Sequence, residues 1–298
     1  MTTAAPTALQ DRFGIIFNVF TFGLPSDRLF ARVVEIAAAI ESTAYDTLWL
    51  PDHLVQGPVG DVADDVSPTT PIFDALTLLG ALAVATERVR LGPLVSPITI
   101  RNPGVLAKSI TTTDVVSGGR AVLGIGAAWD GDEHRRYGLD FPVPGERVSR
   151  LSEAVQVCRA MFDEPVASFS GKFFTVDDAV NVPRPVSAHV PILVGGAGKR
   201  TLRIAAAHAD ACNPIGTTDQ LRDAFELLDR HCDELGRDPS AVSKQAGIMF
   251  HRVNDDIYAK AGEAFALGAD GVILVPWQLA LGPDDFHAIG ERLRTEFG

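Results

Sequence analysis

The chain contains little that would support a metal-dependent or disulfide-linked function. Only three of its 298 residues are cysteines, Cys158, Cys212 and Cys232, and no C-x-x-C pair is present. This number and spacing argue against a disulfide framework and against a structural zinc site. The sequence also lacks H-x-H and H-E-x-x-H motifs, which disfavours a metal hydrolase. We therefore predict that the protein holds no metal ion.

Basic residues are scarce as well. The chain has 26 Lys and Arg against 38 Asp and Glu, which gives a formal net charge of −12. A nucleic-acid-binding protein needs a basic face to neutralise phosphates, so this class is excluded as the main function. No window approaches 18 uninterrupted apolar residues, and the first ten residues lack the basic start and apolar run of a secretory signal. We expect a cytoplasmic protein with neither a nucleic-acid partner nor membrane attachment.

Short β-branched runs alternate with longer amphipathic stretches, a pattern typical of a parallel sheet whose strands are joined by helices. We expect strands at 12–20, 47–52, 90–96, 120–127, 191–195, 211–216, 245–253 and 271–277, and helices at 27–43, 73–86, 104–117, 146–162, 199–208, 218–235, 256–267 and 284–296. Eight such pairs predict an α/β fold of the (β/α)8 TIM barrel type, as one domain over residues 1–298. An open, doubly wound sheet remains the alternative, because periodicity alone cannot separate the two.

Two segments interrupt this alternation. Residues 164–185 place a Gly-Lys pair between apolar and aromatic stretches, which predicts a β-hairpin insertion. Residues 54–72 are polar and rich in Pro and Gly, which predicts a long loop after the second strand. Loops at strand ends often carry function, so we expect these two segments and residues 276–283 to shape a substrate pocket.

The stretch VPILVGGAGKR, residues 190–200, ends an apolar run in glycines followed by two cations. It fails the G-x-G-x-x-G dinucleotide-binding pattern at Thr201, and GIGAAW fails the pattern at Trp129. A strand–glycine–helix junction can still bind a phosphate through the free N–H groups of the first helical turn. The alternative is a tight turn with two solvated cations, and this stretch alone favours neither.

Asp52 and His53 close the second expected strand, which places an imidazole at the carboxyl-end mouth of a barrel. A histidine there can donate to a cofactor or protonate a substrate near neutral pH, whereas the alternative is a structural hydrogen bond to the backbone. Trp129, Asp132 and Glu133 are spaced to share one face of a short helix entering this mouth. Two acids also suit the positive end of a helix, and that is the simpler reading of them.

The third expected strand ends in the run LGPLVSP, residues 91–97, with two prolines in five residues. Because proline cannot donate to a strand ladder, we expect the strand to bulge or bend there.

Four segments together resemble the bacterial luciferase-like monooxygenase superfamily. They are LWLPDH at 48–53, ATERVRLGPLVSPITIRNPGVLAKSITTTDVVSGGRAVLGIGAAWDGDE at 85–133, FSGKFFTVDDA at 169–179 and PILVGGAGKRTLRIAAAHADAC at 191–212. The resemblance extends in consistent order over about residues 12 to 277. Within the superfamily the chain is most similar to the group that depends on the deazaflavin coenzyme F420.

The resemblance implies a (β/α)8 barrel with an insertion, which binds reduced flavin or deazaflavin at the mouth. The implied cofactor is F420, with FMN as the alternative. His53 would act in catalysis, and the Leu94–Val95 bond would match a cis peptide that supports the ring. The implied cofactor-binding residues are Asn18, Asp52, Leu94, Val95, Ser96, Gly126, Ala127, Trp129, Gly195, Gly196, Ala197, Gly198, Arg200 and Thr201.

The implied function is hydride transfer from reduced F420 to a small organic acceptor. An FMN-dependent two-component monooxygenase, with a separate reductase as partner, is the alternative, and a non-catalytic flavin-binding relative is a third possibility. In the sugar-phosphate dehydrogenases of the F420 group a catalytic glutamate stands where this chain has Trp129, and a tryptophan where it has Gln56-Gly57. We therefore do not expect that specific activity. The resemblance also implies a homodimer.

Overall fold

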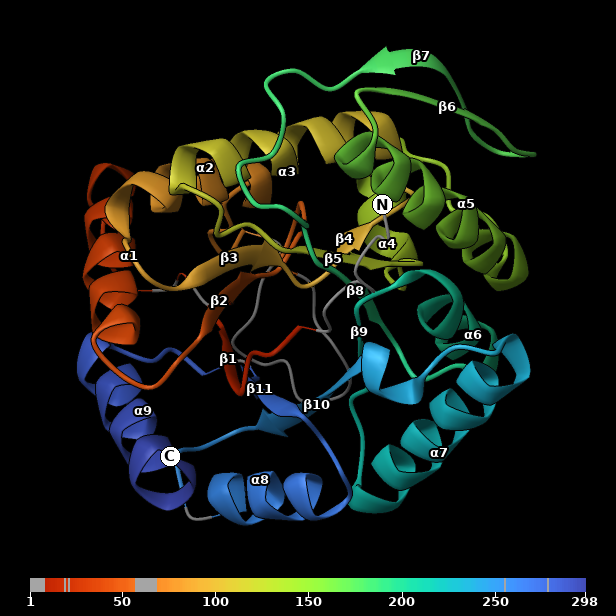
Figure 1. Ribbon diagram of the computed structural model, residues 1–298. Helices are drawn as coiled ribbons and strands as arrows, with labels where there is room; N and C mark the ends of the chain where they lie inside the picture. Colours follow the sequence, from red (N-terminus) through yellow and green to blue (C-terminus); the bar gives the residue numbers. More distant parts are fainter. Residues whose placement is uncertain (1–8, 19, 21, 57–68, 255, 278) are drawn as a thin grey trace.

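Parallel strands surround the centre of the molecule and alternate with helices that form an outer ring (Figure 1). The computed structural model describes residues 9–18, 20, 22–56, 69–254, 256–277 and 279–298. The barrel strands are β1 (Phe13–Ile16), β2 (Thr47–Leu50), β3 (Arg90–Pro93), β4 (Ser96–Pro97), β5 (Leu123–Gly126), β8 (Ile192–Gly195), β9 (Ala211–Asn213), β10 (Ser243–Phe250) and β11 (Gly271–Pro276).

Hydrogen-bonded neighbours in this sheet follow the order β3-β2-β1-β11-β10-β9-β8-β5-β4, and every pair is parallel. The order closes at Leu91 of β3, which pairs with the segment that leads into β5. Its N–H donates to the carbonyl oxygen of Arg120 at 2.9 Å, and its own carbonyl accepts from Val122 N–H at 3.0 Å. The sheet therefore closes into a barrel, which confirms the predicted fold and excludes the open sheet.

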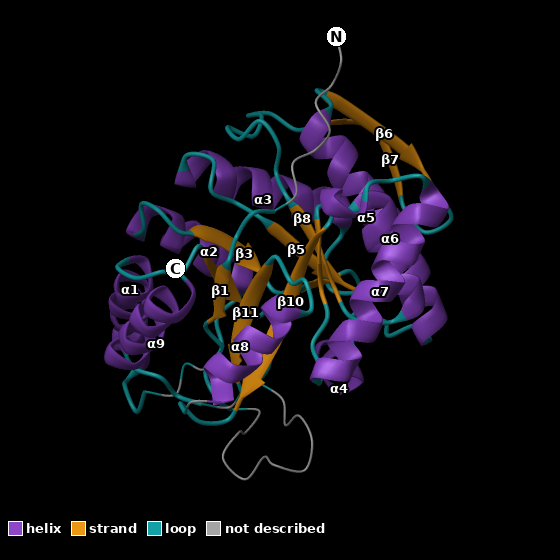
Figure 2. Ribbon diagram, turned by 60° about the horizontal axis from the view of Figure 1, so that its bottom comes forward, coloured by secondary structure: helices purple, strands orange, loops and turns teal. Residues whose placement is uncertain are grey.

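The helices lie outside the barrel (Figure 2). They are α1 (Ser26–Glu41), α2 (Ala75–Ala85), α3 (Pro103–Ser117), α4 (Gly131–Tyr137), α5 (Pro144–Asp163), α6 (Lys199–His208), α7 (Thr218–Leu235), α8 (Asp256–Ala266) and α9 (Pro283–Phe297). Side-chain caps fix several starts: Asn102 accepts from the first turn of α3, and Thr217 forms a capping box with Gln220 in α7. In the described ranges no helix combines the length and apolarity needed to cross a membrane.

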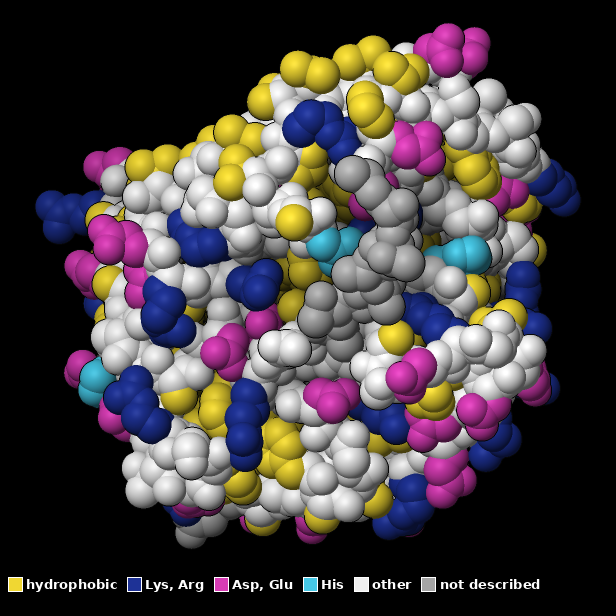
Figure 3. All heavy atoms as spheres, viewed as in Figure 1, with side chains coloured by type: hydrophobic (Ala, Val, Ile, Leu, Met, Phe, Trp, Pro, Cys, Tyr) yellow, Lys and Arg dark blue, Asp and Glu magenta, His cyan; other side chains and the backbone are white. Residues whose placement is uncertain are grey.

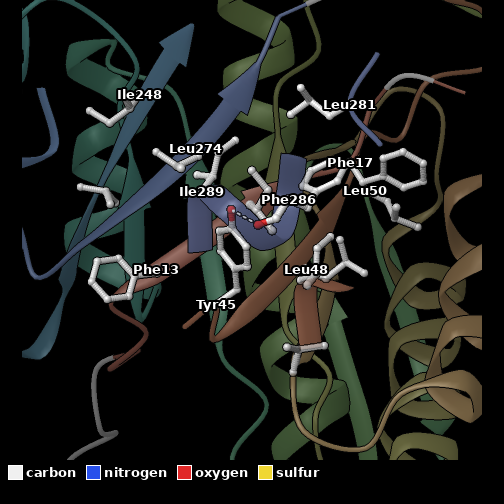
Figure 4. Packing of buried hydrophobic residues seen from close by; sticks show 14 of the residues in the cluster. Phe13, Phe17, Tyr45, Leu48, Leu50, Ile248, Leu274, Leu281, Phe286 and Ile289 are labelled. Carbon is white, nitrogen blue, oxygen red and sulfur yellow. Dashed lines mark hydrogen bonds between the residues drawn. The ribbon is translucent and has the colours of Figure 1, made fainter. Parts of the chain in front are cut away.

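Apolar side chains fill both the inside of the barrel and the layer between sheet and helices. Trp49, Val122, Leu193 and Ile273 belong to the cluster inside the barrel. Figure 4 shows part of the outer layer, where the Tyr45 hydroxyl donates to the carbonyl oxygen of Phe286 in α9 at 3.3 Å. Because the barrel centre is packed, a ligand site is expected at an end of the barrel, and enzymes of this fold use the carboxyl end of the strands.

The third strand is divided in two, as its prolines predict. Leu94 and Val95 separate β3 from β4, and the peptide bond between them is cis, which confirms the implied cis peptide. β2 pairs with β3 and β5 pairs with β4, so both halves remain in the barrel wall. The bend leaves Leu94 and Val95 outside the regular ladder, at the carboxyl end of β3.

The predicted hairpin is present outside the barrel. β6 (Val166–Ser170) pairs antiparallel with β7 (Thr175–Val180), which confirms the insertion expected at 164–185. The hairpin packs against α5, where Glu153 accepts hydrogen bonds from the backbone of the turn. It begins where α5 has carried the chain back toward the amino ends of the strands (Figure 2).

Candidate active site at the barrel mouth

A cavity of about 520 Å³ opens where the strands end. Its apolar lining residues are Ile16, Pro51, Val55, Ile72, Leu94, Val95, Pro97, Ala127, Ala128, Trp129, Ile215, Met249, Val275 and Trp277, with Gly126, Gly195, Gly196 and Ala197 beside them. Its polar lining residues are Asn18, His53, Gln56, Asp130, Glu133, Thr201 and Asn213. A concave, mainly apolar site with a few converging polar groups is the usual form of a small-molecule site.

The structure brings most of the sequence-predicted site residues together in this cavity. Those that line it are Asn18, His53, Leu94, Val95, Gly126, Ala127, Trp129, Gly195, Gly196, Ala197 and Thr201. Their roles toward a cofactor stay predictions. Of the segments expected to shape the pocket, 54–72 and 276–283 adjoin or enter it, through residues such as Val55, Ile72 and Trp277, whereas 57–68 and 278 lie outside the described residues.

The expectation that the hairpin shapes the pocket is wrong. Every residue of 164–185 is described, and none of them lines the cavity. The reason is the direction of the preceding element: α5 leads the chain away from the mouth before β6 begins, so the hairpin lies on the outer surface.

His53 is held at the cavity wall by a buried carboxylate. Its Nδ1 atom lies 3.2 Å from Oε2 and 3.3 Å from Oε1 of Glu133, whose side chain is 1% exposed. Glu133 Oε1 also accepts from the backbone N–H groups of Leu54 and Val55. Asp130 caps α4 and accepts from Glu133 N–H at 3.0 Å, which fixes the start of that helix. The carboxylate thus fixes both the imidazole and the chain that follows it.

This pairing controls the charge of both groups. Burial alone would lower the pKa of His53. The hydrogen bond to Glu133 and its negative charge, together with the charges of Asp130 and Asp52, outweigh burial and raise the pKa above the ordinary 6.5. Burial alone would raise the pKa of Glu133, but His53 and the backbone N–H donors lower it below the ordinary value. Within the described part of the chain no hydrogen bond engages His53 Nε2. His53 can therefore hold a proton beside the cavity.

The predicted shared face of Trp129, Asp132 and Glu133 is wrong. The helix begins only after Asp130, so Trp129 precedes it. Asp132 and Glu133 are consecutive helical residues, so their side chains point about 100° apart around the helix axis. The Asp132 side chain is 76% exposed and pairs with Arg135, whereas Glu133 is buried. Trp129 does wall the cavity: its ring contacts the His53 ring edge to face, with centroids 5.4 Å apart.

Val95 fits between two glycines at the cavity wall. A Cβ atom on Gly126 would come within 2.5 Å of Val95 Cγ2, and one on Gly195 within 2.8 Å of Val95 Cγ1. Neither distance leaves room for a side chain, so glycine is required at both positions for Val95 to keep its place. Two glycines from separate strands therefore fix the bend between β3 and β4 where it meets the cavity.

The glycine loop leads directly into α6. Gly196 has a φ of +117°, a conformation that favours glycine, and Gly198 is the N-cap residue. In the described chain no side chain caps this helix, so its first N–H groups remain available to a ligand. Thr201 in the first turn also lines the cavity. A helix start of this kind can bind an anion such as a phosphate.

Two residues predicted to bind the cofactor lie behind the wall instead. Asp52 is buried and accepts from Ser96 Oγ at 2.6 Å and from Arg101 Nη2 at 2.7 Å. Arg101 also pairs with Asp74, the N-cap of α2. Asp52 and Ser96 thus join β2 to β4 and to the starts of α2 and α3, and they support the mouth from outside the cavity.

Gly198 and Arg200 are likewise not among the lining residues. The Arg200 guanidinium donates to the carbonyl oxygen of Gly145 at 3.0 Å and to Ser149 Oγ at 2.8 Å, and both acceptors belong to α5. The side chain therefore points across the outside of the barrel, where α5 offers acceptors.

Two amide oxygens at the mouth are buried without a partner. Asn18 Oδ1 and Gln56 Oε1 lie in the lining and accept no hydrogen bond from the described residues. Unsatisfied buried acceptors are costly, so a ligand with N–H or O–H donors fits this part of the cavity. Gln56, Asn213 and Trp277 were not predicted as individual site residues, because each lies singly in a loop or at a strand end. Among the described residues no group of three or more His, Cys, Asp and Glu could hold a metal ion.

Comparison with known proteins agrees with this architecture. The family model described as luciferase-like monooxygenase matches residues 12–270. An F420-dependent glucose-6-phosphate dehydrogenase from Nakamurella multipartita is 32% identical over 75% of this chain and 65% of its own length. Pyrimidine monooxygenase RutA from Allorhizobium ampelinum is 28% identical over 72% of this chain and 59% of its own length. The chain thus spans less than two thirds of the length of either relative.

A solved structure has the same fold over nearly the whole chain. It is an F420-dependent secondary alcohol dehydrogenase in complex with an F420-acetone adduct, with a TM-score of 0.79, 17% identity, and coverage of 97% of this chain and 100% of that one. The family match covers most of the chain, and the closed barrel, the cis Leu94–Val95 bond and the mouth cavity accompany it. The chain therefore belongs to the luciferase-like monooxygenase family.

Proposed function

We propose that this protein is an F420-dependent oxidoreductase that catalyses hydride transfer to a small organic acceptor. The observation that carries the proposal is the His53–Glu133 pair in the wall of a largely apolar cavity, where a proton donor stands beside space for a planar ring. The F420-dependent relative, matched over 75% of this chain, supports the choice of cofactor.

The residues at the mouth fit such a cofactor. Reduced F420, a deazaflavin, supplies a hydride from ring carbon C5 when bound. The unpartnered oxygens of Asn18 and Gln56 would accept from N–H or O–H groups of the ligand, and Val95 would support the ring from the bend between β3 and β4. The uncapped start of α6 and Thr201 would hold its phosphate.

The chain's own contribution is proton supply, orientation and exclusion of water. His53 would donate a proton to the acceptor as the hydride arrives, and Glu133 would keep the imidazole oriented and protonated. Trp129 stands beside the His53 ring and would cover the reacting atoms from one side. Such a cover would keep water away from the reacting atoms, which strengthens the electrostatic interactions of the site and limits side reactions.

An FMN-dependent two-component monooxygenase is the second candidate, and the similarity to RutA favours it. The same cavity would hold the flavin, and a separate reductase would deliver it in the reduced form. The two candidates share the site and differ in the cofactor and in the need for oxygen.

A binding titration separates them. Purified protein is titrated with F420 and with FMN, each oxidised and reduced, and the dissociation constants are obtained from cofactor fluorescence. The proposal predicts tighter binding of F420 than of FMN. Binding of FMN alone would overturn it in favour of the monooxygenase.

The His53→Ala variant then tests the catalytic assignment. General acid catalysis contributes typically 10²–10⁴-fold, so we expect kcat to fall by roughly 100-fold or more while cofactor affinity changes little. Unchanged turnover would remove His53 from the mechanism, and loss of binding alone would make it a cofactor ligand.

A further inference from the structure

We propose, on the basis of the proposed function, that the acceptor is a flat, uncharged and largely apolar carbonyl compound, such as a conjugated enone, and that anionic substrates are excluded. The curated relative named above acts on glucose 6-phosphate, which carries a phosphate. The charges around this cavity distinguish the two classes of substrate.

Within the described ranges, the cavity wall offers no guanidinium or ammonium group to a phosphate or carboxylate group of a substrate. Among the described residues that line it, none is Lys or Arg, and the ionisable ones are His53, Asp130 and Glu133. Protonated His53 is already paired with the Glu133 carboxylate, and Asp130 adds a second carboxylate to the lining. An anion entering this space would therefore find no guanidinium or ammonium partner. Burial of an unpaired charge is strongly unfavourable, so an anionic acceptor is disfavoured.

Lys199, exposed in the first turn of α6, is not among the lining residues, and the positions outside the described ranges contain no basic side chain. Residues 57–68 include Asp61, Asp64 and Asp65 and contain no Lys or Arg, and neither do the other positions outside the described ranges. Whatever their arrangement, these residues cannot add a basic side chain to the site.

The arginines just behind the mouth are already engaged. Arg101 pairs with Asp52 and Asp74, and Arg147 donates to the carbonyl oxygen of Ala127 at 3.1 Å. Arg252 and Lys260 line a separate cavity of about 380 Å³ together with Asp256. That second cavity shares only Met249 with the main one, so its cations stand outside the space beside His53.

Trp129 indicates what the site does accept. Its side chain is 55% exposed although it is large and apolar, and it stands at the wall beside His53. Ala128 holds a φ of +64°, rare for a residue with a side chain, directly before it. Trp277 adds a second indole to the lining. Two aromatic walls beside a proton donor suit a flat, uncharged carbonyl compound.

With an enone as the acceptor, the reaction balances with groups already named. The hydride of reduced F420 forms a bond to the β-carbon of the acceptor, the C=C π bond breaks, and His53 donates a proton to the α-carbon. The acceptor gains two electrons and becomes the saturated carbonyl compound, while F420 is oxidised by two electrons. The ring N–H proton that the oxidised cofactor loses passes to water, and water returns a proton to His53.

A matched pair of probes tests the charge rule, by which we mean that the site accepts uncharged acceptors and excludes anionic ones. Methyl 4-oxocyclohex-2-ene-1-carboxylate and its free acid share the reacting enone and differ in charge at neutral pH. With saturating reduced F420 we expect kcat/KM for the ester to exceed that for the carboxylate by at least about tenfold, a difference of 1.4 kcal/mol. Equal values, or a preference for the carboxylate, would overturn the proposal.

An engineered cation supplies the reciprocal test. Ile72→Lys places an ammonium group in the lining and should reduce the preference for the ester or reverse it. Leu235→Lys, at the exposed end of α7, should leave the preference as in wild type. An unchanged preference in a folded Ile72→Lys protein would contradict the role of the lining charge. If circular dichroism shows that this variant does not fold, the wild-type comparison decides.

The same probes separate this inference from the proposed function. If the protein fails to bind F420, the proposed function fails, and the charge rule is then read from quenching of tryptophan fluorescence by each probe. Tighter binding of the ester to the cofactor-free protein would support the rule, and equal or tighter binding of the carboxylate would overturn it. Loss of the preference in Arg252→Ala would instead assign the selectivity to the second cavity and would also overturn it.

Discussion

Glu133 makes the largest contribution to the raised pKa of His53, and it illustrates what a sequence can and cannot show about a site. His53 is predictable, because it lies just beyond β2, a strand that must end at the mouth of a barrel. Glu133 lies in a seven-residue helix, which is too short to show a period, and an acid in a first turn already has a simpler explanation in the helix dipole. Its role appears only when α4 is folded against the segment after β2.

The pH dependence of turnover should reveal this coupling. On the proposal that protonated His53 is the donor, activity is lost as pH rises through its pKa. That pKa lies above 6.5 because Glu133, together with the charges of Asp130 and Asp52, outweighs burial. In Glu133→Gln the burial remains and the negative charge is gone, so the pKa of His53 falls. We expect the high-pH limb of kcat/KM to move to lower pH. Activity measured above the limb should fall about tenfold for each pH unit by which the limb moves.

Asp132→Asn provides the matched control, because it removes one negative charge at the neighbouring position, where the side chain is exposed and paired with Arg135. Its pH profile should match that of the wild type. An unmoved limb in Glu133→Gln, with folding intact, would show that His53 is not the titrating donor or that Glu133 does not control its charge.

At the scale of elements, the bend between β3 and β4 and the glycine loop before α6 behave as one unit. The bend is predictable from Pro93 and Pro97, since proline disrupts a strand ladder. The contact between Val95 and the glycines is not predictable, because Gly126 and Gly195 follow different strands and meet Val95 only in the closed barrel. The wrong prediction for the hairpin has a similar cause. Its sequence pattern identifies the hairpin, but the direction of α5 decides where the hairpin lies.

Gly195→Ala should disturb the cofactor site through Val95. The added methyl group would lie 2.8 Å from Val95 Cγ1, and the branched side chain has little freedom to move away. Overpacking of this kind costs typically about 1–3 kcal/mol, so we expect a lower melting temperature. We also expect cofactor affinity to fall by about tenfold, equivalent to 1.4 kcal/mol. Thermal unfolding and the fluorescence titration measure the two effects.

Gly198→Ala is the control in the same loop, since its nearest neighbour would be Thr201 Oγ1 at an ordinary 3.5 Å. It should bind cofactor nearly as the wild type does. Val95→Ala added to Gly195→Ala should restore part of the lost stability, because it removes the atoms in conflict. If Gly198→Ala is as damaging as Gly195→Ala, the loop rather than the Val95 contact is responsible.

At the scale of the whole molecule, sequence periodicity predicts the alternation of strands and helices. It does not predict that the sheet closes into a barrel, which only the structure shows. Closure depends on the pairing of Leu91 with Arg120 and Val122, a contact between segments about 30 residues apart that has no local signal.

The distribution of side chains over the surface is a second property of the whole molecule. Lys and Arg are mixed with Asp and Glu over the face in Figure 3, and hydrophobic side chains gather along its upper edge, over α2, α3 and the hairpin.

The outer face of α2 and α3 differs from the rest of this acidic chain. α2 contains no charged residue, and in α3 Asp114 is buried and Lys108 donates to the carbonyl oxygen of Val182. Val84, which is 77% exposed, and Val116 project from the carboxyl-terminal ends of these neighbouring helices. Two copies with a net charge of −12 repel each other, and a face without exposed acids is where they can meet at the lowest electrostatic cost.

We therefore propose that the protein forms a homodimer through α2 and α3. Light scattering should give twice the chain mass of 31.8 kDa for the wild type. In a two-fold interface each substitution occurs twice, so Val84→Glu with Val116→Glu would bring four carboxylates together and should yield monomers. Leu235→Glu, an equally drastic change at an exposed apolar residue at the end of α7, should leave the dimer intact. A wild-type monomer, or a dimer that persists in the double variant, would rule out this face as the interface.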